Sequence, residues 1–236
     1  MSSPLRLPRQ DDWDRSLGEL DAAGSAVVPG LLAPGACRAL SDLYDRDGLF
    51  RKRVDMERHG FGRGQYAYFA YPLPGIVQTL REALYPPLAA LANDWSRRLG
   101  LEAAWPATHA GCLAVSRAAG QSRPTPLLLR YRAGDYNCLH QDLYGPCVFP
   151  IQATVLLSRP GDDFTGGEFV LTEQRPRRQS RAEVAPLGQG DAVLFAVRDR
   201  PVRGARGDYR VTMRHGVSRL RSGERCTLGV IFHDAA

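Results

Sequence analysis

The feature of this sequence that most restricts its fold is a series of short apolar segments that fills its second half. Several of them alternate apolar with polar residues, which is the period of a strand with one buried face. Glycines and prolines separate the segments, and many short strands joined by such turns are typical of a sandwich or barrel. We therefore predict a mainly β fold for this half. The predicted strands span residues 127–129, 149–157, 166–172, 192–197, 210–214 and 226–232.

The first part of the chain predicts supporting elements. Residues 1–10 are rich in Ser, Pro and Arg, and we expect a disordered tail there. Asp11 or Asp12 can cap a short helix. The apolar spacing then predicts a strand over residues 24–29 and a helix over residues 33–43.

Helical spacing returns further along the chain. Between Ile76 and Leu99 the apolar residues recur every three or four positions, which predicts one helix, or two helices broken at Pro86-Pro87. Prolines and glycines make residues 104–123 look like a loop, with a short strand over residues 112–115.

Composition limits the class of protein. With 236 residues, 44% apolar and 24% charged, the chain is long enough for one globular domain. It has no run of 18 apolar residues and no apolar segment of a signal peptide near its start. Its five cysteines include no C-x-x-C pair, which argues against a disulfide framework and a zinc ribbon. We expect one cytoplasmic domain over residues 1–236 with no membrane partner, in which residues 11–125 support a core over residues 126–236.

The net charge of +6 comes almost entirely from arginine, because Lys52 is the only lysine. A basic surface favours a polyanionic partner such as DNA or RNA, although a codon habit can also enrich arginine. Residues 51–71 combine arginines, glycines and aromatic rings, which suits a substrate lid with Arg63, Tyr66 and Tyr68 as contacts. The alternative is a β-hairpin whose aromatic rings pack on the core. A second arginine cluster lies at residues 175–181.

The most reactive side chains follow the first predicted strand of the core. His140 and Asp142 are two residues apart in an extended segment, so they point to the same side. An imidazole and a carboxylate on one side suit iron(II), and one further His completes a set that leaves three coordination positions open. His215 is the candidate for that third ligand.

The order of motifs around these residues extends from Leu127 to Asp234. It consists of Tyr131-x-x-Gly134-x-Tyr136-x-x-x-His140-x-Asp142, Gly166-Gly167-Glu168, Gly190-Asp191-Ala192, His215-Gly216-Val217 and Gly223-Glu224-Arg225. This order resembles the iron(II)- and 2-oxoglutarate-dependent dioxygenases, most closely their prolyl-hydroxylase-like branch. Most of the chain is also similar to a bacterial family described as nucleic-acid oxygenases.

The resemblance implies a fold and a reaction. The fold is a double-stranded β-helix, or jelly roll, with supporting N-terminal helices. His140, Asp142 and His215 would bind iron(II), and 2-oxoglutarate and dioxygen would be the co-substrates. Oxidative decarboxylation of 2-oxoglutarate would be coupled to hydroxylation of a C–H bond, so the protein would be an oxidoreductase.

The same resemblance implies a binding site for 2-oxoglutarate. In that family a basic residue about ten positions after the second His binds the distal carboxylate, and Arg225 stands at that spacing from His215. A guanidinium suits a carboxylate because it donates two parallel hydrogen bonds. Arg221 is the competing basic residue. Tyr131 matches a family tyrosine that donates to the same carboxylate, and Thr227 lies on the same strand face as Arg225.

For the substrate the sequence leaves alternatives open. Tyr136, Asn137 and Gln152 are candidate contacts beside the metal motif. We predict oxidative dealkylation of damaged nucleic acid, as in DNA repair, where hydroxylation of an N-alkyl carbon leads to loss of formaldehyde. The well-studied alkylation-repair dioxygenases carry a second arginine six residues after the first, but position 231 here is Ile. A protein hydroxylase that acts on prolyl or other side chains is the alternative, and a binding module without catalysis is the third hypothesis.

Overall fold

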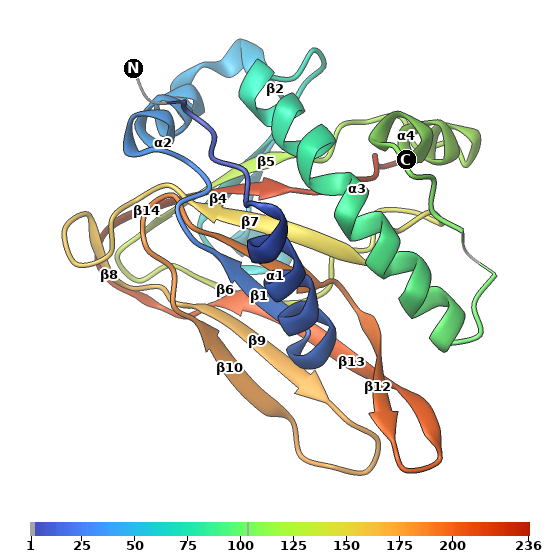
Figure 1. Ribbon diagram of the computed structural model, residues 1–236. Helices are drawn as coiled ribbons and strands as arrows, with labels where there is room; N and C mark the ends of the chain where they lie inside the picture. Colours follow the sequence, from blue (N-terminus) through green and yellow to red (C-terminus); the bar gives the residue numbers. More distant parts are fainter. Residues whose placement is uncertain (1–2, 103) are drawn as a thin grey trace.

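The computed structural model describes residues 3–102 and 104–236, which form two antiparallel β-sheets with helices packed outside them (Figure 1). The larger sheet consists, in spatial order, of β1 (Ser25–Val28), β11 (Ala192–Ala196), β7 (Ile151–Leu156), β14 (Leu220–Val230), β5 (Leu127–Arg132), β4 (Gln65–Phe69) and β2 (Phe50–Asp55), and β8 (Phe164–Gly166) pairs with β14. The smaller sheet consists of β10 (Arg181–Ala185), β9 (Phe169–Gln174), β13 (Gly207–Val217), β6 (Tyr136–His140) and β3 (Gly62–Arg63), and β12 (Asp199–Gly204) pairs with β13.

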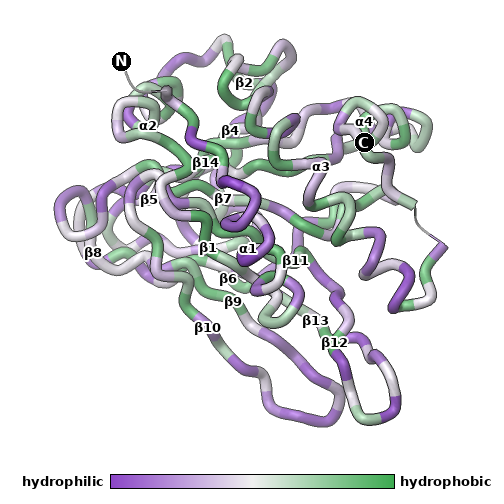
Figure 2. The backbone as a smooth tube through the Cα atoms, viewed as in Figure 1, coloured by the Kyte–Doolittle hydropathy of each residue, from purple (hydrophilic) through white to green (hydrophobic). Residues whose placement is uncertain are grey.

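The core forms where apolar strands stack between the sheets and the helices. Every residue of β7 and β11 is buried, as expected for central strands covered on both faces. Phe169 of the smaller sheet packs 5.1 Å from Phe195 of the larger one, measured between ring centroids, so side chains of both sheets interdigitate. Figure 2 shows the same pattern, with hydrophobic residues in the middle of the molecule and hydrophilic residues in the outer hairpins.

The helices cover the outer face of the larger sheet (Figure 1). They are α1 (Gln10–Ala23), α2 (Pro34–Ser41), α3 (Gly75–Arg98) and α4 (His109–Ala118), with short 3-10 turns η1 (Asp42–Asp45), η2 (Asp47–Leu49) and η3 (Glu57–His59). Trp95 of α3 is buried and donates from Nε1 to Asp21 at 2.7 Å, which joins α3 to α1. In the described part of the chain, no helix is long and apolar enough to cross a membrane.

The mainly β fold, the early helix, strand and helix, and the strands predicted in the second half are confirmed, except that the strand predicted over residues 166–172 is interrupted between β8 and β9. The N-terminal region needs several corrections. The first helix begins at Gln10 after Arg9, so neither Asp11 nor Asp12 is its cap. Residues 1–2 of the expected disordered tail lie outside the described residues. Residues 3–10 pack on the domain, where Leu5 forms a β-bridge with Leu32.

The prediction for residues 104–123 was wrong. Helix α4 occupies half of this segment, and the Thr108 hydroxyl caps it by accepting a hydrogen bond from the Gly111 N–H. Its buried side includes His109 and Cys112, which pack at the end of β14. Helix α3 also continues through Pro86-Pro87 without a break, held by its buried face on the sheet.

Residues 51–71 contain the β-hairpin that the sequence suggested, and the substrate lid stays a prediction. Strands β2 and β4 pair as a hairpin, and Tyr68 and Phe69 are buried against the core. The connection between them crosses to the smaller sheet, where β3 pairs with β6. Gly62 is required there, because its φ is +125° and a Cβ would lie 2.4 Å from the Tyr136 carbonyl oxygen. The segment 56–64 therefore forms a strap between the two sheets.

Candidate metal and co-substrate site

A cavity of about 370 Å³ lies between the two sheets. Side chains of β5, β7 and β14 line it from the larger sheet, and side chains of β6 and β13 line it from the smaller one. Its polar lining includes Tyr131, Asn137, His140, Asp142, Gln152, Thr154, His215, Arg225 and Thr227.

Two paired strands bring the three predicted metal ligands together. His140 ends β6 and is the direct cross-strand partner of His215 on β13, with Asp142 just beyond the end of β6. Gly216 permits this close pairing, since a Cβ there would come 2.7 Å from the carbonyl oxygen of Asn137. The His-Gly sequence on β13 is thus explained by the approach of β6.

The ligand atoms have the spacing of a metal site. The Nε2 atoms of His140 and His215 lie 3.5 and 3.4 Å from the two carboxylate oxygens of Asp142. All three ligand atoms lie within 4.8 Å of one another. Neighbouring ligands of an octahedral ion with bonds of about 2.1 Å stand about 3 Å apart. The chemistry of two imidazoles and one carboxylate therefore fits a divalent iron.

Hydrogen bonds around the three residues hold them in this orientation. The Nδ1–H of His140 donates to the Cys138 carbonyl at 2.8 Å, which leaves Nε2 as the nitrogen that faces Asp142 and can bind a metal. The Tyr144 hydroxyl donates to Asp142 Oδ1 at 2.6 Å, and Gln152 Nε2 donates to Oδ2 at 2.7 Å. Asp142 is therefore fixed at both oxygens.

The charges of Asp142 and His215 match the forms that bind a metal. Burial lowers the pKa of His140, but its hydrogen bond to Asp142 and the charge of that carboxylate outweigh burial and raise the pKa. Burial raises the pKa of Asp142, but its interactions with the two imidazoles outweigh burial and hold that pKa well below its usual range. Burial, and then the nearby charge of His140, lowers the pKa of His215. An anionic carboxylate and a neutral buried imidazole are the ligand forms that a cation needs.

Arg225 is a buried cation inside the same cavity. It is 1% exposed, and its Nε and Nη1 have no hydrogen-bond partner among the described residues. Its guanidinium carbon lies 5.6 Å from the centroid of the Tyr131 ring, and burial lowers its pKa. Thr227 is also buried in the lining. A buried guanidinium without an anion is unfavourable, so this end of the cavity fits a carboxylate ligand. Arg221 is exposed and does not line the cavity.

The structure separates the other predicted contacts into two groups. Tyr66, Asn137 and Gln152 line the cavity, although Gln152 donates to Asp142. Tyr136, Arg63 and Tyr68 do not line it. Tyr136 and Arg63 are exposed cross-strand partners. Tyr68 is buried and packs against Tyr66, which does line the cavity, with 5.3 Å between the ring centroids.

Sequence reasoning missed two features of the site. Tyr144 was not singled out, although its hydroxyl contacts a predicted ligand. At the mouth, Phe61 on the strap and Leu139 on β6 are 48% and 46% exposed and line the cavity. An aromatic residue between two glycines, Gly60 and Gly62, was the available signal for Phe61.

Comparisons with known proteins agree with this architecture. Residues 64–235 match the model of the family Oxygenase-NA, described as an oxygenase catalysing oxidative methylation of damaged DNA. An uncharacterised protein of Mycobacterium tuberculosis strain H37Rv is 51% identical over 174 residues, which are 74% of this chain and 75% of that protein. The matching protein of strain CDC 1551 has the same identity and coverage.

Solved structures with similar folds include two oxygenases and an alpha-ketoglutarate-dependent epimerase. A 2OG-Fe(II) oxygenase family oxidoreductase from Burkholderia pseudomallei has a TM-score of 0.55 and 16% identity, covering 100% of this chain and 98% of that one. A Pseudomonas putida prolyl-4-hydroxylase has a TM-score of 0.52 and 16% identity, with 92% and 96% covered. The epimerase SnoN of nogalamycin biosynthesis has a TM-score of 0.56 and 16% identity, with 94% and 82% covered. At these identities the similarity concerns the jelly-roll fold.

Proposed function

This chain belongs to the Oxygenase-NA family of oxygenases, and from that membership we propose that it removes alkyl groups from damaged DNA bases by oxidation. Its cofactor is iron(II), and its co-substrates are 2-oxoglutarate and dioxygen. The observation that carries the proposal is the presence, in one cavity, of the His140, Asp142 and His215 group and of a buried arginine without an anion.

The places of the residues in the cavity support the following roles. His140, Asp142 and His215 hold the iron, and Tyr144 and Gln152 keep the Asp142 carboxylate in position. Arg225 binds the distal carboxylate of 2-oxoglutarate, with Tyr131 and Thr227 beside it. When bound, the iron and 2-oxoglutarate use dioxygen to hydroxylate a C–H bond while 2-oxoglutarate becomes succinate and carbon dioxide. The apolar walls exclude water from this reaction.

The mouth of the cavity supports a flat substrate. The exposed Phe61 ring and Leu139 side chain offer apolar surface on which an extruded base can stack, and Tyr66 lines the cavity below them. Hydroxylation of an N-methyl carbon gives an unstable product that releases formaldehyde and restores the base. The proposed direction is therefore removal of the methyl group. DNA rather than RNA is proposed because the family is described as acting on damaged DNA.

The proposed compartment is the cytoplasm. All five cysteines lie in the described part of the chain and are free thiols, as is common for proteins of reducing compartments.

The test is an anaerobic mixture of protein, iron(II), 2-oxoglutarate and DNA that is started with oxygen. Succinate and formaldehyde are followed with N-methylated DNA, unmethylated DNA of the same sequence, and methylated RNA. We expect formaldehyde from methylated DNA only, with an equal rise in succinate. Succinate formation that is indifferent to methylation, together with addition of one oxygen atom to an offered peptide, would reject DNA dealkylation in favour of a protein hydroxylase.

A further inference from the structure

We propose that the hairpins β9–β10 and β12–β13 form a basic arm that grips the DNA backbone away from the reacting base. The basic arm is defined as residues 173–183 and 198–214. In Figure 1 the two hairpins extend side by side away from the helices, and the pairing of β9 with β13 joins them. The inference rests on the proposed DNA substrate and adds to it a second contact region.

The net charge of the protein is concentrated in this arm. The arm contains ten arginines and four acidic residues, while the rest of the chain contains 21 basic and 21 acidic residues. The surplus of +6 is therefore located entirely in two hairpins. A charge so unevenly placed indicates a polyanionic partner at that place.

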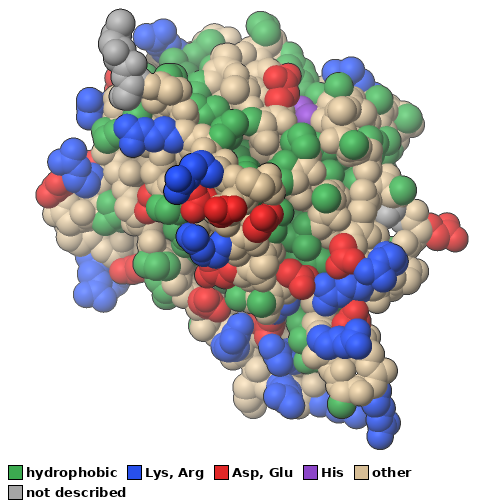
Figure 3. Space-filling model, viewed as in Figure 1, with side chains coloured by type: hydrophobic (Ala, Val, Ile, Leu, Met, Phe, Trp, Pro, Cys, Tyr) green, Lys and Arg blue, Asp and Glu red, His purple; other side chains and the backbone are tan. Residues whose placement is uncertain are grey.

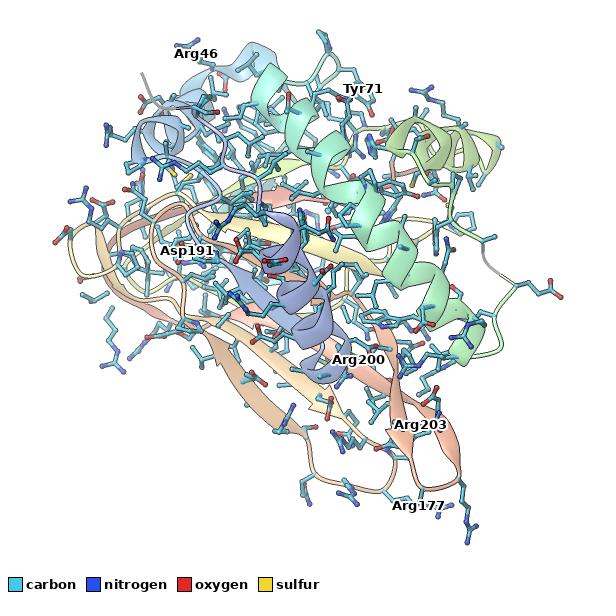
Figure 4. All side chains as sticks on the ribbon, viewed as in Figure 1. Arg46, Tyr71, Arg177, Asp191, Arg200 and Arg203 are labelled. Atoms are coloured by element: carbon cyan, nitrogen blue, oxygen red, sulfur yellow. The ribbon has the colours of Figure 1, made fainter. Side chains whose placement is uncertain are left out.

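The arm's acidic groups are already engaged, which leaves several arginines free. Glu173 pairs with Arg175 and Arg200, and Asp208 pairs with Arg98 of α3 at 2.9 Å. Within the described residues, the arginines of the arm that are exposed and have no acidic partner are Arg177, Arg178, Arg203, Arg206 and Arg214. Figure 4 shows Arg177 and Arg203 at the far end of the hairpins, and Figure 3 shows basic side chains gathered there.

The arm is held in place by buried contacts at its base. Arg200 is fully buried, pairs with Glu173, and donates from Nη1 to the Asp21 carbonyl of α1 at 2.8 Å. Strand β12 pairs with β13 without interruption from Asp199 to Gly204. Because the hairpins are fixed to the domain, their arginines are presented with little loss of backbone entropy on binding.

Strand β13 connects the arm to the metal site and sets the distance between them. Arg206, at the tip, precedes His215 by nine residues. At about 3.3 Å per residue this is about 30 Å, or about nine base pairs of B-DNA at about 3.4 Å each. Arg214 lies next to His215 but is exposed, so it marks the base of the arm. The tip should thus meet phosphates about nine base pairs from the damaged base.

The side chains of the arm suit the phosphates of a nucleic-acid backbone better than a membrane surface. Guanidinium groups bind phosphate oxygens in a bidentate manner. The exposed large apolar side chain nearest to the arm, within the described residues, is Val184 of β10. The arm itself contains no Trp, Phe or Leu, the residues that membrane-binding surfaces combine with basic residues. Backbone contacts of this kind add affinity without sequence preference.

The test compares two variants with equal loss of charge. The arm variant carries Arg177→Gln, Arg178→Gln, Arg203→Gln and Arg206→Gln, all exposed. The control variant carries Arg15→Gln, Arg38→Gln, Arg97→Gln and Arg117→Gln, which are exposed on different helices. Binding is measured by fluorescence anisotropy at several salt concentrations, with duplexes that extend about five or about fifteen base pairs on each side of an N-methyladenine.

We expect the wild type and the control to bind the long duplex more tightly than the short one, and the arm variant to bind both alike. The slope of log K against log salt on the long duplex should fall by up to about 3.6 in the arm variant, at about 0.9 per lost phosphate contact. Equal slopes for the arm and control variants would overturn the proposal. So would a loss of binding to phosphatidylserine vesicles with the DNA slope unchanged.

Formaldehyde release from the short duplex tests the dealkylation separately, because that duplex does not reach the arm's tip. No formaldehyde from either duplex, with the arm effect on binding intact, would reject dealkylation and retain the arm.

Discussion

Arg81 on α3 and Arg225 on β14 are both buried, but the protein balances the charge of only one of them. Arg81 donates to the carbonyls of Ile231 and Phe232 at 2.9 and 3.0 Å and pairs with Asp234 at 3.0 Å. Arg225 has two nitrogens without a partner in the described structure. Burying a charge is unfavourable unless a partner offsets it. The first arginine therefore anchors the end of the chain, and the second is held ready for an anion from outside.

The buried carboxylates Asp234 and Asp142 differ in the same way, since within the described parts of the chain only Asp234 is paired with an arginine. The largest expected effect, on turnover, follows from this difference. Asp234 is held by Arg81 and by the Tyr71 hydroxyl, whereas Asp142 is shared by two imidazoles around a space for a metal. His140→Ala removes one metal ligand without removing a buried anchor. We expect complete loss of iron-dependent 2-oxoglutarate turnover and a nearly unchanged free energy of unfolding, measured by succinate formation and urea denaturation. Turnover close to that of the wild type would remove His140 from the metal site.

The next effect concerns the anchor. Arg81→Met leaves Asp234 buried beside the Tyr71 hydroxyl without its cation, and we expect it to lower the free energy of unfolding by about 3–5 kcal/mol. Urea denaturation followed by circular dichroism measures this loss. Arg225→Met is the matched control, since it removes an unpaired buried charge and should leave stability unchanged or higher. Equal destabilisation by both substitutions would remove the distinction between the two arginines.

Arg225→Met should also act on the co-substrate. Hydrogen bonds from a guanidinium to a carboxylate contribute about 1.5–3 kcal/mol to binding. Their loss should raise the 2-oxoglutarate concentration needed for half-maximal turnover by about 10- to 100-fold. The exposed Arg221→Met is the control and should leave that concentration unchanged. If Arg221→Met had the effect instead, the distal carboxylate would bind at Arg221.

The smallest effect should come from the hydrogen bond behind the metal site. Tyr144→Phe removes the donor to Asp142 Oδ1 and retains the ring that packs near Tyr68. We expect about a tenfold loss of iron affinity with little change in stability. Anaerobic titration with iron(II) against a competing chelator measures this affinity. An unchanged affinity would show that Gln152 alone positions the carboxylate.

The parts of this account that local sequence pattern could predict are those that depend on neighbours in the chain. The alternation of apolar and polar residues predicts most strands of the β core. The spacing of His140 and Asp142 predicts that their side chains point to the same side. The segment 104–123 was misread because the cap at Thr108 and the burial of His109 matter more than its prolines and glycines. The arginine cluster at residues 175–181 could be read from the sequence, but strands β10 and β12 could not, because exposed polar hairpins carry little apolar period.

The pairing of buried charges could not be predicted from the sequence. Arg81 meets Asp234 across 153 positions of the chain, and that contact depends on how α3 packs on the end of β14. Family spacing singled out Arg225, but only the fold shows that Arg225 lacks an acidic partner in the described residues while Arg200 has one. Tyr144 likewise reaches Asp142 through a loop conformation that no periodicity encodes.

The most direct test of the central claim, that the cavity binds 2-oxoglutarate through Arg225, is a calorimetric titration without oxygen. Iron(II)-loaded wild type and Arg225→Met are each titrated with 2-oxoglutarate and with 2-oxopentanoate, which lacks the distal carboxylate. We predict that the wild type prefers 2-oxoglutarate by about 10- to 100-fold and that Arg225→Met binds the two acids with similar affinity. A variant that keeps the full preference for 2-oxoglutarate would contradict the assignment.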